Sequence, residues 1–451
     1  MGNEKSYWIS SGKFTLLERL SMLFFGVATF YLLVRVLDKE GYGTWIFYLT
    51  ITTLLDTARH GFFQNPLIRF LNIDNEGGKN GLWALNKDNL QTTSFLLNLT
   101  MSSLAALLLI GIAYPIALSW DSPHLVYLFF INLLTNVFQT FFFHFEYLLK
   151  ANRRFHGAFF GVFVKGLMLL IIILYFFLSK APMNLSILAF SYAGAAFAGA
   201  CTSYFFVKDL FLITLKLDRQ WVKELFSYGK FTLGANISAV FMRYVDTWMI
   251  GFYISPVAVA IYNVAIRIAN LFEVPSMALA SMLFPEAVKR AQKDGNKAFK
   301  ALYEKSVAVI LLLTLPFVVG VIIFADFIVI QLAGEGYTET IGILKITMLY
   351  GLIIPFNKQM GILLDAVGKA KTNMLFVARN AVINLILNAI AIPYFGTIGA
   401  AYASLSTMVI VLILNQYYLS RTFKIELKKL FGYIMFYFMA IYYKVKNTVI
   451  N

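Results

Sequence analysis

The sequence predicts an all-α integral membrane protein with about 12 transmembrane helices, arranged as two six-helix bundles. Three observations support this fold class. Hydrophobic residues make up 59% of the 451 residues and charged residues only 14%, and the mean hydropathy is +0.72, far from the balance of a soluble globular protein. Apolar stretches of spanning length recur along the chain. The pentapeptide GKFTL begins at Gly12 and again at Gly229, each time where such a stretch begins.

The apolar stretches define the expected spans, because each is long enough to cross a hydrocarbon core of about 30 Å. The first stretch reaches full spanning length without the cleavage pattern of a signal peptide, so we expect it to be retained. The first six spans are expected near residues 13–36, 43–65, 92–118, 124–147, 156–178 and 185–207. The second six are expected near residues 230–252, 258–284, 305–331, 340–364, 372–394 and 399–419.

The distribution of basic residues predicts the orientation, since Lys and Arg stay on the cytoplasmic side during insertion. With the N-terminus inside, the outer loops hold only Lys39 and Lys180. The net charge of +15 is then explained by topology and by contact with anionic lipid, rather than by nucleic acid. The remaining loop cations fall on the cytoplasmic side, near residues 69–87, 150–154, 208–223, 289–300, 369–371 and 421–429.

The repeated pentapeptide predicts two related halves. When the halves are aligned on it without a gap, Asp56 falls on Glu273, and both first loops coincide. Because each half holds an even number of spans, both insert the same way up and are expected to be related by a pseudo-two-fold axis along the membrane normal. The predicted parts are an N-terminal bundle over 1–207, a cytoplasmic amphipathic connector over 208–227 and a C-terminal bundle over 228–420.

The last residues, 421–451, form a basic, aromatic tail. Its segment FGYIMFYFMAIYY, over 431–443, is short for a span and is followed by Lys444 and Lys446. An interfacial or partly inserted helix is favoured, with an incomplete additional span as the alternative.

Several ionisable residues fall at bilayer depth, where they are expensive and usually face a cavity or a partner. Two pairs are spaced three apart on a helix, Asp56 with Arg59 and Arg243 with Asp246, so each pair can neutralise itself locally. A structural ion pair and a functional site both remain open for these pairs. The residues at this depth include the cations Arg59, Lys165, Arg243 and Arg267 and the carboxylates Asp56, Asp246 and Glu273.

Amide side chains recur at helical spacing in three stripes. Such amides commonly join helices by hydrogen bonds. Beside arginines without a carboxylate on their own helix, they also suit a hydrated cavity for hydroxyl-rich cargo. The stripes contain Asn132, Asn136 and Gln139; Asn263, Arg267 and Asn270; and Asn380, Asn384 and Asn388.

Other kinds of site are excluded or disfavoured by the sequence. A single cysteine, Cys201, rules out an internal disulfide and a thiolate metal cluster. The four histidines lack ligand spacing, so no metal site is expected. No GxxxxGK[ST] loop is present, which argues against an ATPase. We expect no catalytic residues and predict that the protein is not an enzyme.

The second half carries a family resemblance. YVDTWMIGFYISPVAVAIYNVAIRI, the following LFPEAVKRAQKDG and the later IPYFGTIGAAYASLS resemble the polysaccharide-biosynthesis flippases, the Wzx-type oligosaccharide-lipid translocases of the MOP (MATE-like) superfamily. The resemblance implies alternating access by two bundles. It also implies export of an undecaprenyl-pyrophosphate-linked sugar repeat, from the cytoplasmic to the outer leaflet of a bacterial inner membrane, for O-antigen, capsule or similar glycans.

Such a cargo needs fixed cations, because a pyrophosphate and several sugars would cost on the order of tens of kcal/mol to bring unscreened through hydrocarbon. Arginine binds phosphate oxygens bidentately and stays charged. We therefore assign the pyrophosphate to a cationic central cavity with Arg243, Arg267, Arg59 and Lys165. No cofactor is expected, although transport coupled to H⁺ or Na⁺ would use Asp246, Glu273 or Asp56.

Two other functions share parts of this pattern. A MATE-type drug exporter has the same architecture, but a net anionic cavity would suit its cationic cargo better. A membrane polysaccharide polymerase or glycosyltransferase generally needs a substantial outer loop, and the outer loops here are short. The expected partners are the lipid-linked oligosaccharide, membrane lipid and other polysaccharide assembly proteins, and not nucleic acid.

Overall fold

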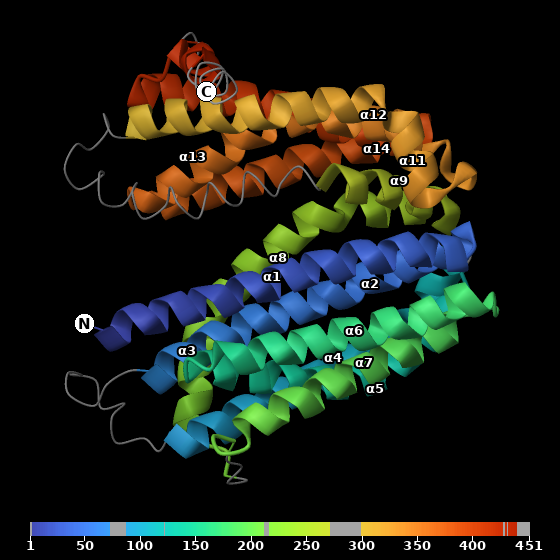
Figure 1. Ribbon diagram of the computed structural model, residues 1–451, viewed down its shortest axis with the longest axis vertical. Coiled ribbons are helices and arrows are strands. Elements are labelled where there is room, and N and C mark those ends of the chain that lie inside the picture. Colours follow the sequence, from blue (N-terminus) through green and yellow to red (C-terminus); the bar gives the residue numbers. More distant parts are fainter. Residues whose placement is uncertain are drawn as a thin grey trace, which may run out of the picture. The chain divides into compact units, whose positions relative to one another are not determined.

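The computed structural model describes residues 2–72, 87–120, 122–211, 216–270, 299–426, 429–430 and 432–439. Every regular element in these ranges is a helix (Figure 1). Seven of the helices are long and apolar enough to cross a membrane, or eight when one bent pair is counted as a single span. The chain is therefore a multi-pass helical membrane protein, as predicted.

The chain divides into two compact units. Unit 1 comprises Met1–Tyr244 and Ser255–Val257, and unit 2 comprises Val245–Ile254 and Ala258–Asn451. Each of the six spans expected up to residue 207 overlaps a helix of unit 1. These helices are α1 (Gly2–Val36), α2 (Lys39–Arg59) with a following π-helix (His60–Gln64), α3 (Asn65–Asn72), α4 (Lys87–Ser119), α5 (His124–Ala151), α6 (Phe155–Ser179) and α7 (Leu185–Val207).

Local sequence explains how α2 begins and ends. Asp38 caps its N-terminus by accepting a hydrogen bond from the backbone N–H of Gly41 at 3.0 Å, as short acidic side chains do at helix starts. Directly after Arg59 the backbone widens into the π-helix and then continues as α3. Single π-turns of this kind occur often at functional sites, and this one follows the buried arginine directly.

Small residues let the helices of unit 1 approach closely. A Cβ atom at Gly199 of α7 would lie 2.9 Å from the Cβ of Lys165 and 3.1 Å from the carbonyl oxygen of Gly161, both on α6. Glycine removes this obstacle, as small residues do at interfaces between membrane helices. Gly199 therefore determines how closely α6 and α7 pack beside Lys165.

The helix α8 (Arg219–Tyr253) begins within the residues predicted to form the connector, and its last residues belong to unit 2. The short helix α9 (Pro256–Ala269) follows. Residues 271–298, which include Glu273 and the second half of the predicted span 258–284, lie outside the described residues. Beyond them the described chain continues with a helix over Phe299–Ile323, α11 (Ala325–Ala333), the 3₁₀ turn Glu335–Tyr337, α12 (Thr340–Gly351), α13 (Ile354–Ala366) and α14 (Ala370–Phe423).

Two predicted spans are interrupted in the structure. The stretch predicted as 305–331 contains two helices, because the first ends at Ile323 and α11 begins after Phe324. The stretch predicted as 340–364 is the pair α12 and α13, which meet at a bend of 41°. Pro355 stands in the first turn of α13, a position that suits its fixed φ and missing N–H. The residues on both sides of each break are apolar, so hydropathy alone does not reveal where the helix is interrupted.

The spans predicted as 372–394 and 399–419 are confirmed as the two parts of α14, which is broken at Gly396. The φ of Gly396 is +65°, a conformation that glycine adopts without steric cost. In the tail, the helical residues 432–439 place Tyr433, Ile434 and Tyr437 against the core of unit 2 and leave Phe436 exposed. The choice between an interfacial helix and an additional span stays a prediction.

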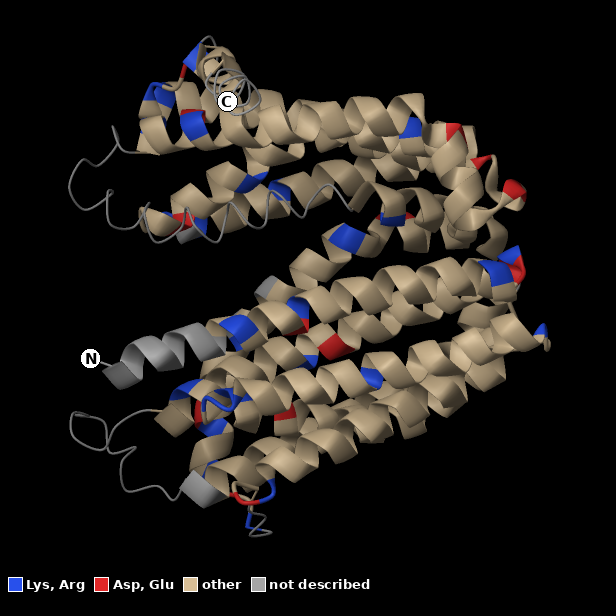
Figure 2. Cartoon of the chain, viewed as in Figure 1, with Lys and Arg blue, Asp and Glu red and all other residues tan. Residues whose placement is uncertain are grey.

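Charged residues lie mainly toward the ends of the helices and are sparser along their middles (Figure 2). At one such end Arg154 donates two hydrogen bonds to the Asp209 carboxylate, at 2.7 and 2.5 Å. These bonds lower the pKa of Asp209 and raise the pKa of Arg154. The pair joins the turn before α6 to the end of α7, in a loop where the positive-inside rule predicts cytoplasm.

The packing of α6 against α7 generates a stability prediction. Gly199→Ala should lower the melting temperature of the detergent-purified protein, because overpacking costs about 1–3 kcal/mol. The matched control is Gly194→Ala, also on α7, where an added Cβ meets nothing within 4 Å. This control should be neutral or stabilising by about 0.5–1 kcal/mol, the usual gain of Ala over Gly in a helix. Equal melting temperatures for the two variants would contradict the close approach.

Candidate functional site

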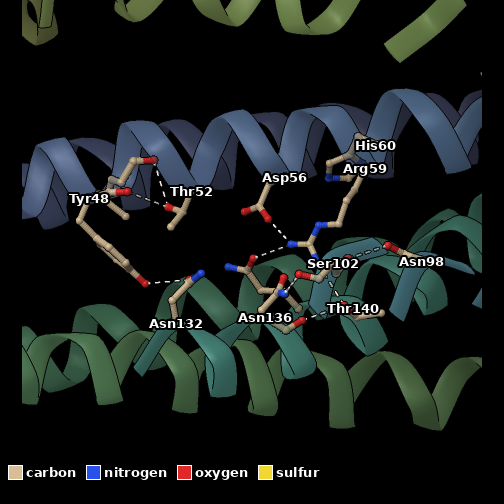
Figure 3. Close-up of polar contacts among 12 residues, drawn as sticks. Tyr48, Thr52, Asp56, Arg59, His60, Asn98, Ser102, Asn132, Asn136 and Thr140 are labelled. Carbon is tan, nitrogen blue, oxygen red and sulfur yellow. Dashed lines mark hydrogen bonds and ion pairs between the residues drawn. The ribbon is translucent and has the colours of Figure 1, made fainter. Parts of the chain in front are cut away.

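A buried arginine organises the polar interior of unit 1 (Figure 3). The side chain of Arg59 is only 6% exposed and forms an ion pair with Asp56, one turn earlier on α2. Its guanidinium also donates hydrogen bonds to Ser102 of α4 at 3.1 Å, to Thr140 of α5 at 3.0 Å and to Gln139 of α5 at 3.2 Å. The predicted pair Asp56 and Arg59 therefore forms, and it ties three helices together.

Amides extend this arrangement along the same helix interface. Asn136 donates to the backbone carbonyl of Ser102 at 2.6 Å, and Tyr48 of α2 donates to Asn132 at 3.0 Å. Asn132 and Asn136 are both buried. The stripe predicted on α5 thus joins this helix to α2 and to α4 by hydrogen bonds. Joining helices is the commoner of the two roles considered for such amides.

Lys165 of α6 is held among aromatic rings. Its ammonium lies 4.8 Å from the ring centre of Phe142, 5.5 Å from that of Phe143 and 5.6 Å from that of Tyr192. Arg59 lies 5.4 Å from the same Phe143 ring. No ion pair to Lys165 occurs in the described part of the chain. Cation–π contacts stabilise a desolvated ammonium by about 2 kcal/mol or more, but the rings carry no negative charge that would pair with Lys165.

In unit 2 a carboxylate, that of Asp246, is the centre of a group of hydrogen-bonded side chains. Asp246 of α8 accepts hydrogen bonds from Asn388 at 2.6 Å, Ser404 at 2.7 Å and Tyr262 at 2.8 Å. Of the two alternatives left open for Arg243 and Asp246, the local ion pair does not form: α9 and α14 bring neutral donors to the carboxylate, and the side chain of Arg243 is exposed. Spacing along one helix could not reveal these partners from distant elements.

The remaining predicted polar residues of unit 2 are distributed more widely. Arg267 donates to Asn263, one turn earlier on α9, at 3.0 Å, whereas Asn270 is exposed. Asn384 accepts from Asn388 at 3.1 Å and so belongs to the group around Asp246. Asn380 instead accepts from Arg379 at 3.0 Å, away from that group.

Sequence reasoning missed the hydroxyl partners of both charged centres. Ser102 and Thr140 accept hydrogen bonds from Arg59, and Tyr262 and Ser404 donate hydrogen bonds to Asp246. Ser102 follows Asn98 at i, i+4 on α4, a helical spacing that could have marked it. Within the described ranges, no group of three or more His, Cys, Asp or Glu side chains could hold a metal ion.

Comparison with known proteins identifies the family. Residues 32–342 match the family described as Polysaccharide biosynthesis protein. This chain belongs to that family. A probable low-salt glycan biosynthesis flippase, Agl15 of Haloferax volcanii, is 27% identical over 198 residues, which cover 44% of this chain and 42% of that one. The probable flippase AglR of the same organism is 26% identical over 239 residues, half of each chain.

A third relative is the teichuronic acid biosynthesis protein TuaB of Bacillus subtilis, which is 23% identical over 48% of this chain and 45% of its own. The chain thus spans about half the length of the curated relatives it matches. These relatives are named for glycan biosynthesis or flipping, which agrees with the family.

Solved structures establish the fold. The Lipid II flippase MurJ in an inward closed conformation matches with a TM-score of 0.72 at 14% identity, over 93% of this chain and 90% of that one. An inward-facing multidrug resistance MATE family transporter of the MOP superfamily gives a TM-score of 0.74 at 12% identity, over 90% and 94%. The predicted helical two-bundle fold is therefore confirmed.

The central ion pair of unit 1 generates a second prediction. Replacing Arg59 alone by Met, or Asp56 alone by Leu, should destabilise the protein by about 3–5 kcal/mol, because each leaves one charge without its partner. The double variant should be more stable than the less stable single variant, since no charge remains to be compensated. Thermal unfolding in detergent measures all three, and strictly additive losses would contradict the coupling.

Proposed function

We propose that the protein is a flippase that moves a polyprenyl-pyrophosphate-linked oligosaccharide repeat unit from the cytoplasmic to the outer leaflet. Membership of the polysaccharide biosynthesis family is the observation that carries this proposal. The names of the relatives and the fold shared with a lipid flippase support it. In this proposal the N-terminus is cytoplasmic, the membrane is a bacterial inner membrane, and other polysaccharide assembly proteins supply and use the cargo.

The electrostatics of the interior suit an anionic cargo. Lys165 carries a charge that aromatic rings contact but do not neutralise, and Arg243 presents an exposed side chain. Arg59 and Arg267 are positioned by hydroxyl and amide oxygens. A pyrophosphate that replaced these uncharged oxygens would pair each guanidinium with an opposite charge, and such bidentate pairs add both energy and geometric specificity. We assign these four cations to binding the cargo.

We further propose that Asp246 couples transport to H⁺ or Na⁺. The carboxylate has only neutral donors as hydrogen-bond partners among the described residues. The adjacent Asn388 has a buried side-chain oxygen without a hydrogen-bond partner. Buried acceptors without donors are unfavourable, and a bound cation or proton at this carboxylate would satisfy them. Glu273 and Asp56 remain further candidates for coupling.

A MATE-type drug exporter shares the fold, and fold alone does not distinguish the two functions. The family match favours the glycan carrier. The deep cations in unit 1 also oppose a cationic drug as cargo.

The cargo assignment is tested by substitution of two arginines. Arg243→Ala and Arg267→Ala should each reduce surface polysaccharide by at least about tenfold, because losing one charge-assisted contact costs at least about 1.4 kcal/mol. Protein levels should stay normal. The control is Lys371→Ala, which replaces an exposed lysine near the start of α14 and should leave export unchanged. Full export in both arginine variants would overturn the assignment.

Ion coupling is tested at Asp246. Asp246→Asn keeps the size of the side chain but removes its charge, so in liposomes it should abolish the dependence of transport on an imposed H⁺ or Na⁺ gradient. Purified yield and monodispersity should match the wild type. A variant that responds normally to both gradients would exclude Asp246 as the coupling residue.

A further inference from the structure

A stripe of polar residues follows one face of α4 and then stops. Gln91, Ser94, Asn98 and Ser102 recur at helical spacing and are all buried. Beyond Ser102 the same spacing continues with Ala106, Leu109 and Ala113, which are also buried. One end of this helix face is therefore polar and the other is apolar, with the change next to Arg59.

On the facing side of α5 the change comes farther along, because Asn136, Thr135 and Asn132 are buried polar residues that precede the apolar Phe129 and Leu125 on that face. Asn136 donates to the Ser102 carbonyl, and Arg59 bridges Ser102 and Thr140. Because α5 runs antiparallel to α4, these contacts set a register that places the next polar residue of α5, His144, opposite Ser94 and Asn98. The ring of Phe95, between those two residues in sequence, lies 5.1 Å from the ring of His144, which agrees with this register.

The polar part of this seam contains hydrogen-bonding atoms that the protein does not satisfy. His144, Ser94 and Asn98 are each 0% exposed. In the described chain the following buried atoms have no hydrogen-bond partner: Gln91 Oε1, Ser94 Oγ, Asn98 Nδ2, and both ring nitrogens of His144. Buried groups of this kind in native proteins are generally satisfied by ordered water. Several such atoms along one seam point to more than one water molecule.

The apolar part of the seam is closed by large side chains. Phe129 and Leu125 of α5 are 0% exposed, and Trp45 of α2 is 1% exposed. Tyr48, which donates to Asn132, packs its ring against Phe129 and Trp45. A region lined by apolar side chains stays dry, so water that reaches Asp56 and Arg59 along the polar part would go no farther.

We propose that the seam between α4 and α5 holds a file of internal water molecules that connects the Asp56–Arg59 pair to one end of unit 1 only. That end is where α4 begins and α5 ends, beside Lys150, and the positive-inside rule predicts that it is cytoplasmic. Chains of water and polar side chains carry protons in membrane proteins, so the file keeps Asp56 in exchange with that side. The inference concerns water alone and stands whatever the cargo is.

Radiolytic footprinting of the purified wild-type protein tests the file, because hydroxyl radicals generated from internal water label buried neighbours. Phe95 and His144 should be oxidised during millisecond X-ray exposure although both are buried. Trp45 belongs to a more reactive residue type, yet it should remain protected together with Phe129. Protection of Phe95 and His144 equal to that of Phe129 would overturn the proposal, as would labelling of both parts of the seam.

A stability measurement provides an independent test. In a dry seam, His144→Phe would remove two unsatisfied nitrogens and raise the melting temperature. With water present those nitrogens are satisfied, so the substitution should leave the melting temperature unchanged or lower it. Ser203→Ala is the matched control, because Ser203 Oγ is also buried without a partner but lies on α7 against Gly161. A rise for His144→Phe as large as for Ser203→Ala would contradict the water file.

Discussion

A charged or hydrogen-bonding side chain at bilayer depth must find its partner within the protein, because hydrocarbon offers none. The two units meet this constraint in different ways. Unit 1 balances Arg59 with Asp56 and then surrounds the pair with hydroxyls and amides from α4 and α5. In the described part of unit 2, Asp246 instead receives hydrogen bonds from neutral donors of α9 and α14. These contacts determine which helices pack together and in what register.

This difference bears directly on transport. A carboxylate held by neutral donors can exchange those contacts for a proton or a cation, whereas a neutralised arginine can exchange its carboxylate for a phosphate. In the proposed function, the candidate for ion coupling, Asp246, belongs to unit 2, and most of the cations assigned to the cargo belong to unit 1. Lys165 extends the cationic set, because the aromatic rings around it provide attraction without neutralisation.

Much of the fold could be predicted from sequence, because composition and spanning length govern helices in lipid. Breaks within the predicted spans could not, since nothing in hydropathy distinguishes Phe324 from its neighbours, whereas the break at Gly396 falls between two predicted spans. The pair Asp56 and Arg59 was predictable from local spacing. The partners of Asp246 come from α9 and α14, and such long-range contacts left no pattern along one helix. Glu273 lies outside the described residues, so its role stays a prediction.

We propose that the protein moves a lipid-linked glycan between leaflets. The most direct test is to delete the gene in its host, extract the polyprenyl-linked sugars and determine which leaflet holds them. If the protein is the flippase, completed repeat units should accumulate on the cytoplasmic leaflet while surface polysaccharide is lost. Normal surface glycan together with new sensitivity to cationic dyes would contradict it and would indicate a drug exporter.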